Sequence, residues 1–249
     1  ATIVPRMEIL GKRALVTGGA VRVGRTLALA LARAGADVVV NYHSSAREAA
    51  ETVGEIEALG RRALAVRADV SSEADVRRLV GACGDELGGL DILVNSASLF
   101  ESAPLARITR ADWDRVLAVN LTGPFLLSRE AAPLLRADGG GVIVNIADLS
   151  AFQAWPSYTH HAVSKAGLVH LTRVLARALA PEVRVSCIAP GTVLPPEGYG
   201  PDQLARDEGR TALGRIGAPE DVAKALLYLV ESDFVTGEVM VVDGGRLLG

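Results

Sequence analysis

The stretch "ALVTGGAVRVGRTLALALARAGADVVV", residues 14–40, decides the fold of this chain. It starts as a short β-rich run, turns through Gly18, Gly19 and Gly24, and continues as an Ala-rich helical pattern that leads into a second β-rich run. Glycines in such a turn let the main chain come close to a phosphate. The N-terminus of the helix offers unpaired N–H groups and partial positive charge to the same phosphate. The stretch therefore predicts a strand–turn–helix unit that binds a dinucleotide.

Beyond this unit, short β-rich runs alternate with longer helical patterns. Most of these runs are near-continuously apolar, which is typical of strands buried on both faces; they are residues 13–17, 37–41, 63–67, 91–95, 142–147, 183–188 and 238–242. Apolar spacing of i, i+3, i+4 predicts helices at residues 23–33, 46–59, 73–87, 112–136, 160–180 and 219–230. The alternation indicates βαβ units. We expect one α/β domain over residues 1–249, a Rossmann-type doubly wound sheet of about seven parallel strands with helices on both faces.

Local signals mark helix ends and one long loop. Ser72 and Thr109 are predicted N-caps, and Gly35 and Gly60 are predicted helix stops. Residues 192–217 form the one long stretch without periodicity, rich in Gly and Pro. Loops of this length in a compact α/β domain are usually lids or binding loops, so we expect a substrate loop there.

Composition excludes several classes of partner. The net charge of −3 shows no basic excess of the kind that nucleic-acid binding needs. Cys83 and Cys187 form no metal or redox motif and no disulfide framework, which favours a reduced, cytoplasmic setting. No apolar stretch approaches the length of a membrane span, and the N-terminus lacks an export pattern. His43, His160 and His170 have no partner pattern that suggests metal, and we expect none.

The end of the second predicted strand indicates which coenzyme is bound. NAD sites commonly carry an acid there to hold the ribose 2′-OH, whereas this chain has Asn41, Tyr42, His43 and Ser44. Without a carboxylate, a 2′-phosphate is tolerated, which favours NADP(H); a polar loop indifferent to either coenzyme is the alternative. Asp69, followed by Val70, is a candidate acceptor for the adenine edge or a cap for the next turn.

Nine strings, in order and over nearly the whole chain, resemble the short-chain dehydrogenase/reductase family. They are "TGGAVRVG", "ADV", "DILVNSAS", "AVNLTGPF", "GGVIVNIAD", "HAVSKAGL", "IAPGT", "LGRIGAPEDVA" and "VTGEVMVVDGG". The resemblance implies hydride transfer between a nicotinamide coenzyme and a small molecule. It also implies that helices 112–136 and 160–180 pair between subunits, giving a homodimer or homotetramer.

Three details look like the pteridine reductases within that family. Arg22 lies inside the glycine loop, where a phosphate contact and a solvated side chain are both open. In that branch a serine at Ser98 meets the coenzyme, a phenylalanine at Phe100 stacks on the pterin, and an aspartate at Asp148 replaces the usual catalytic serine. The structural alternatives to these functional roles are a core position for Phe100 and a strand-end cap at Asp148.

The family's proton-donating pair is Tyr-x-x-x-Lys, and this chain departs from it. Lys165 matches the lysine, but four residues before it stands His161, while Tyr158 lies seven residues before. Asn120 matches the family asparagine that relays protons through water. Three interpretations stay open: His161 donates the proton with help from Asp148, Asp148 or a water donates while His161 orients substrate, or the site is weak toward family substrates.

The resemblance also assigns the remaining contacts. Phe100, Asp148, Tyr158 and His161 are expected to face the substrate. The residues expected to line the coenzyme are Gly18, Arg22, Val23, Gly24, Asn41, Tyr42, His43, Ser44, Asp69, Val70, Asn95, Ala97, Ser98, Lys165, Pro190, Gly191 and Thr192. The predicted activity is NADPH-dependent reduction of a pteridine; the alternatives are a generic keto or 3-oxoacyl reductase and an NADP-binding sensor or scaffold with little catalysis.

Overall fold

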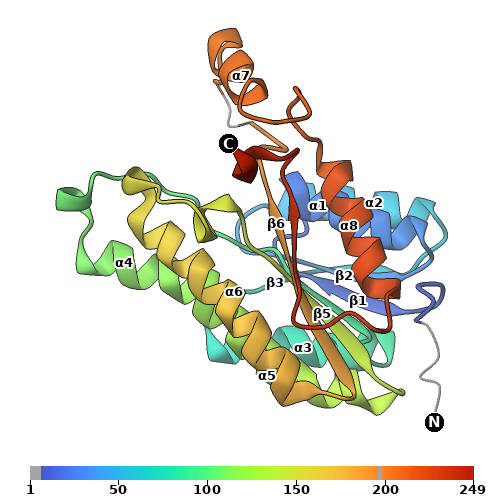
Figure 1. The fold of residues 1–249 in the computed structure, drawn as a ribbon. Coiled ribbons are helices and arrows are strands. Elements are labelled where there is room, and N and C mark those ends of the chain that lie inside the picture. The colour runs from blue at the N-terminus through green and yellow to red at the C-terminus, as the bar shows by residue number, and fades with distance from the viewer. Residues whose placement is uncertain (1–6, 196–197) are drawn as a thin grey trace.

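A seven-stranded parallel sheet forms the centre of the molecule (Figure 1). The computed structural model describes residues 7–195 and 198–249; residues 1–6, where no export pattern is expected, and residues 196–197 of the predicted substrate loop lie outside the described residues. The strand order is β3-β2-β1-β4-β5-β6-β7, as the predicted Rossmann-type doubly wound sheet requires. The strands are β1 (Arg13–Val16), β2 (Asp37–Tyr42), β3 (Ala63–Arg67), β4 (Ile92–Asn95), β5 (Gly141–Ile146), β6 (Val183–Pro190) and β7 (Val239–Val242).

Helices cover both faces of the sheet, as the sequence predicts (Figure 1). One layer holds α1 (Arg22–Arg33), α2 (Ala46–Ala58) and α8 (Pro219–Glu231), and the other holds α3 (Glu73–Leu87), α4 (Arg110–Leu117), α5 (Gly123–Ala137) and α6 (Thr159–Leu179). Along β1, Ala14 and Val16 pack into the first layer's core and Leu15 into the second. Because successive strand residues point to opposite faces, a strand buried on both faces is apolar at every position.

The predicted helix over residues 112–136 is wrong as a single element. The chain forms α4, then a π-helical turn at Ala118–Thr122, then α5. Pro124 has no N–H to donate to the carbonyl of Asn120, so the regular helical ladder is interrupted there. The wide turn holds Asn120 in the interior, where its side chain is 1% exposed. Such turns are frequent at functional sites.

The predicted irregular stretch over residues 192–217 is also wrong in part, because it contains α7 (Pro201–Glu208). Gln203 Oε1 accepts a hydrogen bond from Gly200 N at 2.9 Å, and Pro201 occupies the first helical position, which suits its fixed φ. A helix this short and polar has too little apolar periodicity to be recognised. It projects beside the C-terminus, away from the sheet (Figure 1).

The predicted helix ends are confirmed. Thr109 and Asp112 form a capping box, and Ser72 accepts a hydrogen bond from Asp75 N. Gly35 and Gly60 end α1 and α2 with φ of +100° and +75°, conformations that glycine adopts without a Cβ penalty. Within residues 7–195 and 198–249, no helix is both long and apolar enough to cross a membrane.

Candidate active site

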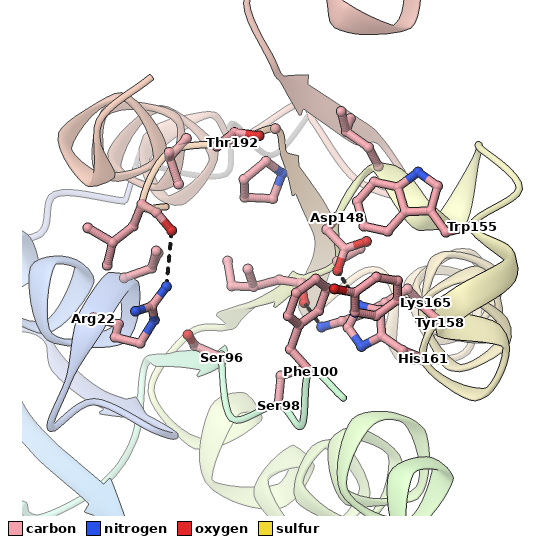
Figure 2. Close-up of a pocket in the computed structure, with 18 of the residues that line it drawn as sticks. Arg22, Ser96, Ser98, Phe100, Asp148, Trp155, Tyr158, His161, Lys165 and Thr192 are labelled. Carbon is pink, nitrogen blue, oxygen red and sulfur yellow. Dashed lines mark hydrogen bonds and ion pairs between the residues drawn. The ribbon is translucent and has the colours of Figure 1, made fainter. Parts of the chain in front are cut away.

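A cavity of about 880 Å³ lies at the carboxyl ends of the central strands (Figure 2). Open α/β sheets bind ligands at this edge, where the strand order reverses between β1 and β4. The glycine loop borders one side, and the segments after β4, β5 and β6 border the rest. Arg22 and the pair Asp148–His161 lie on opposite sides of the view in Figure 2.

The glycine loop has the geometry expected of a phosphate cradle. Gly18 has φ of +62°, and a Cβ at Gly24 would come within 2.2 Å of the Gly18 carbonyl oxygen. The N-cap of α1, Val21, makes no side-chain capping bond. The first N–H groups of α1 therefore lack intrahelical partners and are available to an anion in the cavity. The residues present fit the pyrophosphate of a dinucleotide coenzyme.

Arg22 has a left-handed backbone and crosses the cavity mouth. It is the one non-glycine residue with positive φ (+53°) among those the structure describes. Its Nη2 donates to the Leu194 carbonyl oxygen at 3.0 Å, across to the loop after β6 (Figure 2). This conformation costs an L-residue roughly 1–2 kcal/mol. The guanidinium lines the cavity beside the glycine loop, within the region where the sequence predicts a phosphate contact.

The end of β2 opens on a second cavity, of about 260 Å³. His43, Arg67 and Arg78 line it together with Asp69 and Asp75. The carboxyl end of β2 contributes no carboxylate to this lining, so the feature that favours NADP(H) in the sequence is also present in the fold. The cavity adds two arginines, from β3 and α3, that the sequence did not single out.

Three predicted coenzyme contacts also have structural partners. Asn41 is 2% exposed; its Oδ1 accepts from Gly18 N, and its Nδ2 donates to three carbonyl groups. Asp69 Oδ1 accepts from the N–H and hydroxyl of Ser71, so Asp69 caps the following turn. Asn95 Nδ2 donates to Asn145 inside the sheet. Direct coenzyme contacts by these three side chains stay predictions.

Asp148 and His161 form the central contact of the site. His161 Nε2 lies 2.6 Å from Asp148 Oδ2, and His161 Nδ1 lies 2.9 Å from the Leu99 carbonyl oxygen. Both of these oxygens are acceptors and suit N–H groups of the ring, while Asn120 Nδ2, a donor, lies 3.3 Å from Nδ1. Asp148 Oδ1 in turn accepts from Ser150 N and Oγ. The segments after β4 and β5, together with α6, thus orient the Asp148–His161 contact.

The charge of Asp148 follows from its surroundings. Burial on its own would raise the pKa of this carboxyl, but the hydrogen bond from His161 and the positive charge of Lys165 outweigh it and lower the pKa to about 2. Asp148 is therefore a carboxylate at neutral pH. The His161 ring lies at contact distance from this carboxylate, and Ser150 donates to its other oxygen, so both oxygens of the buried carboxylate have partners.

Lys165 and Asn120 complete the site in different ways. Lys165 is 3% exposed and donates from Nζ to the Ile146 carbonyl oxygen at 2.9 Å. Burial lowers the pKa of Lys165, while the carboxylate of Asp148 opposes that shift. Asn120 Nδ2 donates to the Leu99 carbonyl oxygen and to Ser164 Oγ, and Leu99 N donates to Asn120 Oδ1. Asn120 therefore holds the 98–99 segment against α6, next to the ring of His161.

Aromatic side chains form one wall of the cavity. The Phe100 ring stacks on Tyr158 with centroids 4.6 Å apart and meets His161 edge-on at 4.8 Å. Trp155 meets Phe100 edge-on at 6.4 Å. Tyr158 ends the 3-10 turn before α6 and lines the same cavity as His161. Phe100 is 51% exposed, so the alternative that it is a core residue is wrong.

Comparison with known proteins extends this geometry to a family. A family model described as "Enoyl-(Acyl carrier protein) reductase" matches residues 19–246. The crystal structure of a short-chain dehydrogenase from Burkholderia cenocepacia J2315 in complex with NADP is 36% identical, with a TM-score of 0.90 over 97% of this chain and all of that one. The chain belongs to the short-chain dehydrogenase/reductase family.

Two curated relatives in this short-chain dehydrogenase/reductase family are equally similar. The 3beta-hydroxysteroid dehydrogenase 1 of Eggerthella lenta is 39% identical over 97% of this chain and 95% of that protein. A Streptomyces violaceoruber protein named as ketoacyl reductase 2 of the granaticin polyketide synthase is 39% identical over 94% and 96%. These names support the family and its oxidoreductase chemistry, and they do not support the narrower resemblance to pteridine reductases.

The fold brings most of the predicted site residues together in the main cavity and adds residues that the sequence did not single out. The predicted residues that line the main cavity are Gly18, Arg22, Val23, Gly24, Ala97, Ser98, Phe100, Asp148, Tyr158, His161, Lys165, Pro190, Gly191 and Thr192. Leu99, Ser150 and Trp155 were missed. Ser150 has a local signal, two residues after an aspartate that ends a strand, whereas the role of the Leu99 carbonyl is visible only in the fold.

Proposed function

We propose that this protein is an NADPH-dependent reductase of small ketones. The observation that carries the proposal is the 2.6 Å contact between His161 Nε2 and Asp148 Oδ2, beside buried Lys165, in the cavity that the glycine loop borders. A proton on a fixed acid close to a coenzyme cradle is what ketone reduction requires. When bound, the coenzyme supplies the hydride.

Glycine-loop and strand-end residues would hold that coenzyme. The N-terminus of α1 and Arg22 suit the pyrophosphate. At the end of β2, His43, Ser44 and Arg67 suit a 2′-phosphate, and the similar Burkholderia cenocepacia enzyme is in complex with NADP. Thr192 and Lys165 line the part of the cavity in which the nicotinamide half would lie.

His161 is the proposed proton donor, in place of the family tyrosine. Its Nδ1–H stays bonded to the Leu99 carbonyl oxygen, so the proton available to a substrate is the one on Nε2. A substrate carbonyl oxygen that takes the place of Asp148 Oδ2 at Nε2 would accept that proton as negative charge develops on it. His161 is then neutral, and the product hydroxyl can donate to Nε2 or to the Asp148 carboxylate.

Lys165 gives the site its net charge. In the proposed mechanism His161 begins protonated and balances the charge of Asp148, so a protonated Lys165 would leave about one positive charge near the reacting oxygen. A fixed positive charge in a buried site stabilises a developing alkoxide. The hydrogen bond from Nζ to the Ile146 carbonyl oxygen holds this charge in place.

The ketone substrate is favoured over the pteridine that the sequence suggested first. Arg22, Asp148 and Phe100 are all at the cavity, which keeps pteridine reduction testable. However, one face of Phe100 is already covered by Tyr158, and the two curated relatives are named for a hydroxysteroid and a ketoacyl substrate.

A substrate panel separates the candidates. NADPH oxidation should be measured with keto esters, oxo-steroids and dihydropterins at equal concentration, and repeated with NADH. Turnover of ketones with NADPH and none of dihydropterins supports the proposal. The reverse pattern would restore pteridine reduction. Tight NADPH binding without turnover of any class would favour the sensor or scaffold.

The homodimer or homotetramer implied by the family resemblance is also a proposal. Phe125 on α5 and Val163 and Val174 on α6 are apolar and 41–50% exposed. Light scattering of the purified protein measures the mass of the assembly. A monomer at micromolar concentration would contradict this part of the proposal.

A further inference from the structure

We propose that Arg210 and Arg246 form a subsite for a carboxylate carried by the substrate. They lie at the end of the cavity next to α7, which we call the lid end. The inference rests on the proposed reduction of a ketone in the same cavity and adds a chemical class to it: a keto acid whose anionic group lies away from the reacting carbonyl. Both arginines line the cavity that also contains Asp148 and His161.

Arg246 is held at the cavity from the far end of the chain. It lies in the short 3-10 turn Arg246–Leu248 beside α7 (Figure 1). Its side chain is only 14% exposed, and its Nη1 donates to Thr192 Oγ1 at 2.7 Å. Thr192 follows β6 and lines the same cavity. Arg246 is thus a largely buried cation that its hydrogen bond orients.

Asp207 on α7 pairs with both arginines through Oδ1, while its Oδ2 accepts two hydrogen bonds. Its side chain is 9% exposed and accepts from Thr192 Oγ1 at 3.1 Å and Tyr199 Oη at 3.3 Å. Arg246 Nη1 lies 3.6 Å and Arg210 Nη1 lies 3.9 Å from Asp207 Oδ1. Both separations exceed hydrogen-bond length.

This cluster has an excess of positive charge. Among the cavity-lining residues at this end, two guanidinium groups face one carboxylate, and the nearby Asp243 accepts from Gly245 N and Leu247 N instead. About one positive charge therefore remains among the lining residues. Each guanidinium carries five N–H donors in a planar fork that matches a carboxylate. An incoming carboxylate would accept charge-assisted hydrogen bonds from Arg210 and from the part of Arg246 that Thr192 does not use.

The rest of the cavity is compatible with such a substrate. The aromatic wall of Phe100 and Trp155 suits an apolar ring, and the positive lid end suits an anion. Asp148, the acid on the catalytic side, is paired with His161. The alternative is a purely structural role for both arginines, in which each only pairs with Asp207 on α7 and neither binds substrate.

The test measures binding to the NADP-saturated protein, so that it does not depend on turnover. Calorimetry is run with phenyl ketones that carry an ω-carboxylate at increasing chain length, with their methyl esters, and with phenylalkanoates that lack the ketone. The variants are Arg210→Met, Arg246→Lys and the control Arg206→Met. Arg206 is exposed on α7, donates to the Asp202 carbonyl oxygen and does not line the cavity.

The expected result is that one chain length of keto acid binds about tenfold tighter than its ester. Arg210→Met should remove most of that difference without weakening the ester, Arg246→Lys should reduce it, and Arg206→Met should preserve it. Equal affinity of acid and ester for the native protein overturns the inference, as does an equal effect of the Arg206 and Arg210 variants.

The inference and the proposed function fail in different ways. Reduction of the ester with no preference for the acid leaves the ketone reductase intact and overturns the subsite. Binding of phenylalkanoates that Arg210→Met abolishes, with no ketone reduced, supports the subsite and contradicts the proposed reaction.

Discussion

The two ends of the cavity are built in opposite ways. The phosphate cradle at the coenzyme end comes from one stretch, β1, the glycine loop and α1, and it presents main-chain N–H groups and glycines. The substrate end gathers side chains from separate segments, residues 98–100, 148–161, 192–194, 199–210 and 246. A site made of backbone depends on conformation, whereas a site made of side chains depends on how distant segments pack. Mutations at the two ends should therefore separate coenzyme binding from chemistry.

Replacing His161 should have the largest effect. His161→Ala removes the proposed proton donor, so we expect kcat to fall by about 10²–10⁴-fold while the Kd for NADPH stays within about twofold. Steady-state kinetics and fluorescence titration measure the two quantities. His170→Ala is the control, because His170 is exposed on the same helix. Comparable kcat for His161→Ala and the native protein would remove His161 from the chemistry.

Replacing Asp148 should show the energy of the ion pair. The pKa of Asp148, lowered from 3.8 to about 2, means that its stabilisation is complete above about pH 4 and is lost as pH falls toward 2. Asp148→Asn should therefore lower the free energy of unfolding at pH 7 by about 2 kcal/mol, and by roughly half as much at pH 3, which lies between the two pKa values.

Denaturant unfolding at both pH values tests the Asp148 prediction. Asp114→Asn serves as the control, because Asp114 is half-exposed and pairs with Arg110 within α4. Exposed pairs of this kind contribute roughly 0.2–1 kcal/mol. A stability difference for Asp148→Asn that does not change between pH 7 and pH 3 would mean that packing, and not charge, accounts for it.

A change at the coenzyme end should alter the preference between coenzymes and leave the substrate end intact. Arg67→Met removes a cation beside His43, so we expect the Kd for NADPH to rise about tenfold and that for NADH to stay constant. Arg47→Met, on the exposed face of α2, is the matched control. Equal losses for both coenzymes would show that Arg67 does not meet the 2′-phosphate.

The smallest effect is expected where backbone conformation alone is tested. At Arg22, with φ of +53°, glycine relieves a strain that alanine retains. We expect Arg22→Gly to be more stable than Arg22→Ala by about 1 kcal/mol, and within about 1 kcal/mol of the native protein because glycine also makes the unfolded chain more flexible. Thermal unfolding of the pair measures this. An alanine variant at least as stable as the glycine variant would contradict the strain at this position.

Much of the fold was readable in advance because its signals are local. Apolar runs predicted the strands, and Gly35, Gly60, Ser72 and Thr109 marked helix ends through their own side chains or lack of one. The interrupted helix at Asn120 and the short helix α7 were not predicted. At Asn120 the apolar periodicity runs on without a break, although Pro124 interrupts the regular helix. In α7 the helix is short and polar, so its periodicity is weak.

The sequence by itself determined the phosphate cradle at the coenzyme end. The order of strand, glycine loop and helix predicts its geometry, because main-chain N–H groups and glycines form the cradle. The resemblance to the short-chain dehydrogenase/reductase family also placed Asp148, His161 and Lys165 in one site. Only the tertiary structure decided what those side chains do. It put the Leu99 carbonyl against one ring nitrogen of His161 and Asp148 against the other, and it brought Arg246 across more than fifty residues of chain to Thr192. Contacts between distant segments depend on packing, and no local pattern in the sequence encodes them.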